Sequence, residues 1–134
     1  MNLVLDASAG IAVALDRPQG TAVSGALGAA DIVFAPHLYL TEVANVVWKY
    51  IMQGQYGSQD ALTITALAES LVDQFCDDSE ILPTALTDAV ELRHPVYDLL
   101  YLSLAKSVGA HLCTLDKRLA NLATQTGVVV TGLT

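Results

Sequence analysis

The sequence NLVLDASAG occupies residues 2–10 and decides how the rest of the chain is interpreted. It begins with an apolar run long enough for one short strand and ends that run on a carboxylate, Asp6. Small residues follow, and a second apolar run over residues 11–15 predicts a helix. A buried strand that passes directly into a helix is typical of α/β proteins with a parallel sheet.

The same alternation of strand and helix continues to the end of the chain. Four more short apolar stretches predict strands, over residues 31–35, 79–82, 110–114 and 128–131. Helices are predicted between them, over residues 21–30, 36–53, 58–76, 83–92, 97–108 and 116–124. Pro36 is placed as the first residue of its helix. We therefore predict one α/β domain over residues 1–134, with a five-stranded, mainly parallel sheet and no internal repeat or linker.

The composition excludes several classes of protein. Hydrophobic residues make up 53% of the chain and charged residues only 15%, which excludes intrinsic disorder. So few charges predict an apolar surface that a partner or a second copy covers. No apolar run is long enough to span a membrane, and the N-terminus lacks the basic region of a signal peptide. Two isolated cysteines, Cys76 and Cys113, predict free thiols in a reducing, cytoplasmic compartment.

The formal net charge of −8 excludes a broad basic face for nucleic acid. A polyanionic substrate would have to be held by a local cluster of basic residues or through bound metal cations. The search for a site therefore turns to carboxylates in apolar surroundings.

Two carboxylates follow predicted strands. Asp6 comes directly after the first strand, and Asp116 follows the strand over residues 110–114. Each has a structural alternative as the N-cap of the next helix, with Ser8 as another candidate cap at the first position. The carboxyl ends of parallel strands near a topological switch point are also where ligands bind.

Two further carboxylates lie in helices. Glu42 belongs to a helix that is apolar nearly all round, where it shares one narrow polar stripe with Asn45 and Lys49. A solvated edge with a weak Glu–Lys pair explains it as well as a cleft does. Asp98 lies in the first turn of the helix over residues 97–108, where a negative charge is favourable without any further role.

Convergence of these carboxylates at one sheet edge would have a chemical consequence. Neighbouring carboxylates repel and raise one another's pKa unless cations neutralise them. Hard oxygen ligands select Mg²⁺ or Mn²⁺. Such a site hydrolyses phosphodiesters with a metal-activated water, and no His or Cys is required.

At these four positions the sequence resembles PIN-domain proteins, and most closely the VapC-type toxins of bacterial toxin–antitoxin pairs. The matching segments are VLDAS at 4–8, LTEVAN at 40–45, VYDLLYLSLA at 96–105 and CTLDKRL at 113–119. They occur in the family's order and span nearly the whole chain. The third segment is the most distinctive.

The resemblance implies a three-layer α/β/α fold and a Mg²⁺- or Mn²⁺-dependent endoribonuclease that leaves a 5′-phosphate and a 3′-hydroxyl. The implied catalytic and metal-binding residues are Asp6, Glu42, Asp98 and Asp116, with Ser8, Asn45 and Thr114 as supporting polar residues. It also implies a homodimer that acts on RNA and is held inactive by a cognate antitoxin.

Basic residues cluster near the proposed site along the sequence. Five of the six lie within eight positions of one of the four carboxylates, and Arg17 is the exception. We therefore expect a small basic rim in which Lys117 and Arg118 contact RNA, although two solvated charges on a surface helix are the simple alternative. The aromatic residues Tyr39, Trp48 and Tyr50 are expected in the core or at a dimer face rather than stacked on bases.

Two other functions have to be weighed. A catalytically silent PIN-fold module that acts only through a protein partner is the main alternative to the enzyme, and metal-dependent cleavage separates the two. A response-regulator receiver is excluded, because Asp6 stands alone after the first strand and the last strand has no lysine.

Overall fold

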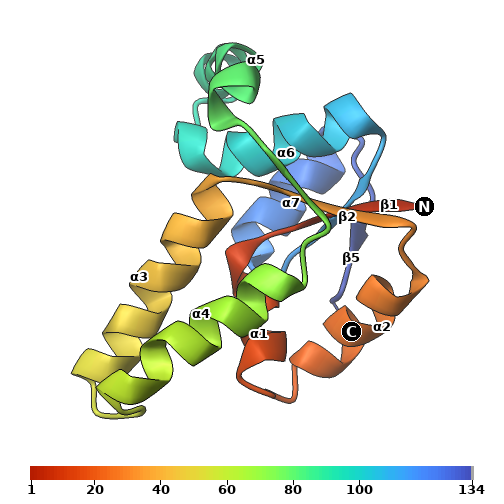
Figure 1. Cartoon of the computed structure of the whole chain (residues 1–134). Helices are drawn as coiled ribbons and strands as arrows, with labels where there is room; N and C mark the ends of the chain where they lie inside the picture. Colours follow the sequence, from red (N-terminus) through yellow and green to blue (C-terminus); the bar gives the residue numbers. More distant parts are fainter. Residues whose placement is uncertain (134) are drawn as a thin grey trace.

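The computed structural model describes residues 1–133 and has a parallel five-stranded sheet at its centre (Figure 1). The strands are β1 (Asn2–Leu5), β2 (Ile32–Pro36), β3 (Gln74–Cys76), β4 (His111–Cys113) and β5 (Val130–Thr131). Their order across the sheet is β3-β2-β1-β4-β5, and every neighbouring pair is parallel. The prediction of an α/β fold with a five-stranded parallel sheet is confirmed.

Seven α-helices cover the two faces of this sheet. They are α1 (Ala7–Ala14), α2 (Gly20–Ala29), α3 (Leu38–Met52), α4 (Ala61–Ser70), α5 (Asp78–Leu92), α6 (Val96–Val108) and α7 (Lys117–Gln125), with a 3₁₀ turn at Ser58–Asp60 before α4. Helices α1 to α4 lie on one face, and α6 and α7 lie on the other with α5 packed outside α6 (Figure 1). The molecule therefore has the three α/β/α layers that the resemblance implies.

The core lies around the central strand and the helix that crosses it. Residues Leu3, Val4 and Leu5 of β1 are fully buried, because both faces of the strand are covered. Helix α6 packs against β1, β2 and β4, and its residues 99–105 are all buried. This helix carries the distinctive third motif, so that motif is largely a packing signature with Asp98 at its exposed end.

The chain reverses its direction across the sheet at β1 and β4. From β1 the chain enters α1 on one face, whereas from β4 it enters α7 on the opposite face. The two neighbouring strands remain hydrogen-bonded up to their carboxyl ends, where the Asp6 backbone N–H donates to the Cys113 carbonyl at 3.1 Å. This divergence leaves a crevice at their carboxyl ends, which is the usual ligand position in open α/β sheets.

Three predicted boundaries are wrong. Residues 79–82 are not a strand but part of α5, and the third strand, Gln74–Cys76, lies in the stretch that was predicted as the end of a helix. Asp77 explains the difference, because its side chain accepts from the Ser79 backbone N–H at 2.9 Å and starts the helix before Pro83. Pro36 ends β2 instead of beginning a helix.

The aromatic residues of α3 divide between core and surface. Tyr39 is fully buried, and its hydroxyl donates to the Ala68 carbonyl at 2.6 Å. Trp48 is 57% exposed, so its expected place in the core is wrong and a place in an interface stays a prediction. Both cysteines are free, as predicted. Among residues 1–133, no helix combines the length and apolarity needed to cross a membrane.

Two helices end on a left-handed residue that is not glycine. Asp16 has φ 52° after α1, where the Arg17 N–H donates to the Ala12 carbonyl at 2.9 Å. Arg93 has φ 54° after α5, where the His94 N–H donates to the Ala89 carbonyl at 3.0 Å. Both are Schellman-type ends, a conformation that glycine normally supplies.

Candidate active site

Asp6 is the most constrained carboxylate of the four. It is only 5% exposed, and its Oδ1 accepts from the Ser8 hydroxyl at 2.7 Å and from the Ala9 N–H at 3.0 Å. Its Oδ2 accepts from the Thr114 hydroxyl. Asp6 is therefore both the N-cap of α1, as the structural alternative proposed, and a carboxylate held in one orientation by its neighbours.

Two hydroxyl groups tie the end of β1 to the segment after β4. The Leu115 N–H donates to the Ser8 Oγ at 3.0 Å, and the Asp116 N–H donates to the Thr114 Oγ1 at 3.0 Å. Each hydroxyl thus accepts from one loop while it donates to Asp6. The structure brings Ser8 and Thr114 to the site as expected, whereas Asn45 is exposed on α3 and has no hydrogen bond to the four carboxylates within residues 1–133.

Asp116 occupies the N-cap of α7. Its Oδ1 accepts from the backbone N–H groups of Arg118 and Leu119, at 2.9 and 3.4 Å. The structural alternative for Asp116 is therefore present in the fold, as it is for Asp6. A capping role does not exclude a second role, because a carboxylate has acceptor capacity beyond the cap.

The other two carboxylates come from helices on opposite faces of the sheet. Glu42 of α3 accepts a hydrogen bond from the hydroxyl of Tyr101, which is 2% exposed on α6. Asp98 of α6 has its Oδ2 buried without a hydrogen bond, at 3.4 Å from His94 Nε2 and 3.9 Å from Arg118 Nη2. Asp98 thus carries an unused buried acceptor oxygen.

The carboxylates influence one another electrostatically. Burial raises the pKa of Asp6 to about 6, the charge of Glu42 adds to this, and the hydrogen bonds from Thr114 and Ser8 oppose it. Burial also raises the pKa of Glu42, with additional repulsion from Asp98 and Asp116. The pKa of Asp98 is raised first by burial and further by Asp116, while His94 and Arg118 lower it.

The donor set fits a hard divalent cation in its chemistry. All four groups are carboxylates, repulsion from a neighbouring carboxylate adds to the burial that raises the pKa values of Asp6, Glu42 and Asp98, and one buried oxygen of Asp98 accepts no hydrogen bond. As the side chains stand, no group of three His, Cys, Asp or Glu side chains within residues 1–133 is placed to hold a metal ion. The centre is open: Asp6 is held by the protein, and Glu42 and Asp98 approach it from two other helices.

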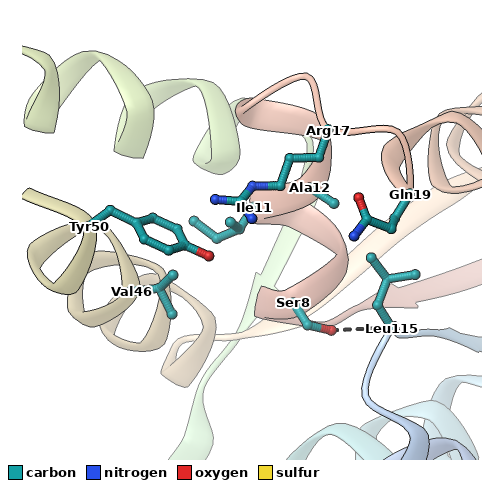
Figure 2. Close-up of a pocket in the computed structure, with 8 residues that line it drawn as sticks. All are labelled: Ser8, Ile11, Ala12, Arg17, Gln19, Val46, Tyr50 and Leu115. Atoms are coloured by element: carbon teal, nitrogen blue, oxygen red, sulfur yellow. Dashed lines mark hydrogen bonds between the residues drawn. The ribbon is translucent and has the colours of Figure 1, made fainter. Parts of the chain in front are cut away.

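Sequence reasoning missed two residues near this centre. His94 lies beside Asp98 at the i, i+4 spacing, a signal that the sequence carries. Arg17 was the one basic residue left out of the expected rim. The structure places it at a pocket beside Ser8, with its guanidinium 4.6 Å from the centre of the Tyr50 ring (Figure 2). Of the two residues expected to contact RNA, Arg118 lies beside a site carboxylate and Lys117 is an exposed neighbour.

Fold and site together define an α/β protein with an acidic centre at the switch point of its sheet. The family model described as PIN domain matches residues 3–125. The chain therefore belongs to the PIN-domain family.

Known proteins of this family resemble the chain along nearly its whole length. Ribonuclease VapC3 of Pyrobaculum aerophilum is 31% identical over 125 residues, which cover 90% of this chain and 93% of that protein. The crystal structure of PAE2754 from the same organism has a TM-score of 0.74 at 26% identity and covers 97% of this chain and 83% of its own.

Two more distant structures share the fold. Mycobacterium tuberculosis VapC20, described as a toxin that cleaves the sarcin–ricin loop, has a TM-score of 0.70 at 14% identity, over 95% of this chain and 96% of its own. Rickettsia felis VapBC2, bound to a promoter DNA fragment, has a TM-score of 0.65 at 13% identity, over 97% of both chains. At these identities the likeness concerns the fold alone.

Proposed function

We propose that the protein is a metal-dependent endoribonuclease and the toxin of a toxin–antitoxin pair. The observation that carries the proposal is the buried Asp6, locked by Ser8 and Thr114 at the switch point of the sheet, with three other carboxylates whose charges reach one another there. The identity of 31% to a ribonuclease over nearly the whole chain supports the same reading.

Mg²⁺ or Mn²⁺ would be held by Asp6, Glu42, Asp98 and Asp116. A bound cation of this kind supplies an activated water and neutralises charge on the phosphate that is cut. The chain's own contribution is orientation. Ser8 and Thr114 hold the Asp6 oxygens in one direction, Tyr101 holds Glu42, and Arg118 offers a positive charge beside Asp98 for a phosphate oxygen.

We further propose a homodimer and a protein antitoxin as partners of a single PIN-like domain over residues 1–134. One sheet that includes strands from both ends of the chain supports the single domain, although residue 134 itself lies outside the described residues. Exposed apolar side chains support protein partners, and they lie on α3 and α4 (Trp48, Met52, Leu62, Leu67) and on α5 (Leu82, Leu86, Val90). A complex is the form in which the structure of VapBC2 was determined.

One observation supports an alternative function, a catalytically silent binding module of the same fold: the carboxylates in the described part of the chain do not converge as a metal site. Among residues 1–133 no three His, Cys, Asp or Glu side chains are placed to hold a metal ion, and a protein that only binds its partner would keep this geometry too. Cleavage separates the two readings.

The test is cleavage of a mixed RNA pool by the purified, antitoxin-free protein with Mg²⁺, with Mn²⁺ and with chelator. Asp98→Asn is the informative variant, because Asp98 is not part of the network that holds Asp6. Glu91→Gln is the matched control, since Glu91 is an exposed carboxylate on α5. We expect metal-dependent cutting that Asp98→Asn lowers by at least about 100-fold and Glu91→Gln leaves unchanged. Absence of cutting by the unaltered protein with either metal would favour the silent module.

A further inference from the structure

A pocket of about 240 Å³ adjoins the acidic centre between α1 and α3 (Figure 2). Its lining residues are Ser8, Ile11, Ala12, Arg17, Gln19, Val46, Tyr50 and Leu115. Ser8 belongs to both places: its hydroxyl donates to Asp6 and accepts from the Leu115 N–H, while the same side chain forms part of the pocket wall. An occupant of the pocket therefore lies directly beside the proposed site of cleavage.

The lining combines an apolar wall with one cation. Ile11, Val46 and Leu115 supply the apolar surface, and the Tyr50 ring stands at one side with the guanidinium of Arg17 over it at 4.6 Å (Figure 2). Within residues 1–133 no carboxylate lies within ion-pair distance of Arg17. Its charge is therefore free for a ligand, and the planar guanidinium suits both phosphate oxygens and a stacked ring.

The size of the pocket limits what it can hold. Pockets for drug-sized ligands measure about 300–1,000 Å³, so 240 Å³ suits a smaller flat group. A single nucleobase against Tyr50 and the apolar wall satisfies this limit. Base–aromatic stacking is the usual way in which proteins hold single-stranded nucleic acid.

The charge of the protein points to the same class of ligand. With a net charge of −8 the chain attracts RNA only where a cation stands close to the path of the backbone. Arg17 is such a cation, on the α1 side of the centre, whereas Arg118 stands on the α7 side. A strand bound across the centre would meet one arginine on each side.

We propose that this pocket binds one nucleotide of the RNA substrate next to the phosphodiester that is cut. Its base stacks on the Tyr50 ring beside the apolar wall, in the place of the Arg17 guanidinium, which moves to the phosphate of the same nucleotide. This inference rests on the proposed ribonuclease function and assigns to it a specificity pocket and a residue that the sequence did not reveal. An apolar side chain of a protein partner is the competing occupant, and it leaves the Arg17 charge without a ligand.

RNA binding tests the pocket separately from cleavage. Short single-stranded RNAs, intact and with one abasic position, are titrated in chelator against Asp98→Asn protein so that no cutting interferes. The compared variants add Arg17→Ala, Arg17→Lys or Tyr50→Leu to this background. Lys106→Ala is the matched control. The sequence spacing included Lys106 in the expected basic rim, but the structure places it near the amino end of β4, at the opposite edge of the sheet. Melting temperatures verify that each variant is folded.

We expect Arg17→Ala to weaken binding roughly tenfold and Tyr50→Leu to remove the preference for intact over abasic RNA. The plot of log affinity against log salt concentration should become shallower by about 0.7 for Arg17→Ala, as for one lost phosphate contact. Arg17→Lys should keep the salt dependence and lose part of the affinity. Lys106→Ala should change neither quantity.

The pocket assignment is overturned if Arg17→Ala and Lys106→Ala bind RNA alike, whether or not the unaltered protein cuts RNA. It is also overturned if Arg17→Ala weakens binding only to a protein partner. Failure of the unaltered protein to cut RNA with either metal, together with the expected binding losses, would refute the nuclease and keep the nucleotide pocket.

Discussion

Asp6 and Asp98 occupy the same centre but are supported in opposite ways. Asp6 is buried at the end of β1, and three donors from Ser8, Ala9 and Thr114 reach its two oxygens. Asp98 is half-buried in the first turn of α6, where its Oδ2 has no hydrogen bond and a histidine stands at 3.4 Å. Protein hydrogen bonds fix the orientation of Asp6 without any ligand, whereas Asp98 has one buried oxygen that accepts no hydrogen bond from the protein.

This difference separates what the fold provides from what a ligand must provide. The groups around Asp6 join two strand ends, so they contribute to stability whether or not a cation is bound. The surroundings of Asp98 do little for the fold and leave an acceptor available. Substitutions around Asp6 should therefore affect unfolding, and substitutions around Asp98 should affect the proposed reaction.

The largest effect on stability is expected for Thr114→Val, which keeps the shape of a fully buried side chain. The change leaves Asp6 Oδ2 and the Asp116 N–H without their partner, which costs about 1–3 kcal/mol of the free energy of unfolding. Chemical denaturation measures it. Thr87→Val, at an exposed threonine of α5, is the control and should stay within about 0.5 kcal/mol. Equal effects of the two changes would remove the contrast.

The pH dependence of stability in chelator should show the second effect. The pKa of Asp6 rises from 3.8 in the unfolded chain to about 6 in the folded one, so the folded protein holds the proton more tightly. The resulting stabilisation is complete below about pH 4 and is lost as the pH rises through about 6, with a size on the order of 1–3 kcal/mol at most. The free energy of unfolding should therefore fall between about pH 4 and about pH 6 and level off above it.

Asp6→Asn should flatten this pH profile, because the substituted side chain does not titrate. Glu91→Gln removes the same charge at an exposed position and should leave the slope as it is. If the free energy of unfolding of Asp6→Asn still fell with rising pH as in the unaltered protein, other carboxylates of the centre would cause the pH dependence.

The smallest effect on stability is expected for His94→Ala, about 1 kcal/mol. The imidazole is largely buried and its Nδ1 lies 3.0 Å from the Pro95 carbonyl oxygen, but it makes no hydrogen bond to Asp98. Because the charge of His94 lowers the pKa of Asp98 and so favours its ionised form, metal-dependent cleavage should fall roughly tenfold without it. His37→Ala, at an exposed histidine after β2, is the control in both assays. A large loss of stability with unchanged cleavage would reverse the comparison.

The strands and carboxylates that were predicted correctly are those that leave a signal in a short stretch of sequence. β1 and β4 are buried on both sides of the sheet, so each appears as an apolar run that ends on a polar residue. Asp6 follows its strand directly, and Asp116 comes three residues after the end of β4. β3 was missed because it has three residues at the edge of the sheet and none of them is fully buried.

The rest of the site depends on tertiary structure. Arg17 is eleven residues from Asp6 in sequence, and the left-handed turn that ends α1 places it at the pocket beside the centre. Asn45 shares a polar stripe with Glu42, yet the packing of α3 leaves it exposed. Sequence spacing does not determine either outcome.

The length of α1 and its left-handed end together fix where Arg17 lies relative to Asp6. Asp6 stands at its first turn and Arg17 just beyond its last, so the number of residues between them sets both the distance and the direction from the carboxylate to the arginine. An α-helix turns by about 100° per residue, so a chain one residue longer or shorter in α1 would point its arginine away from Tyr50. The length of α1 should therefore tolerate insertion and deletion far less well than its side chains tolerate substitution.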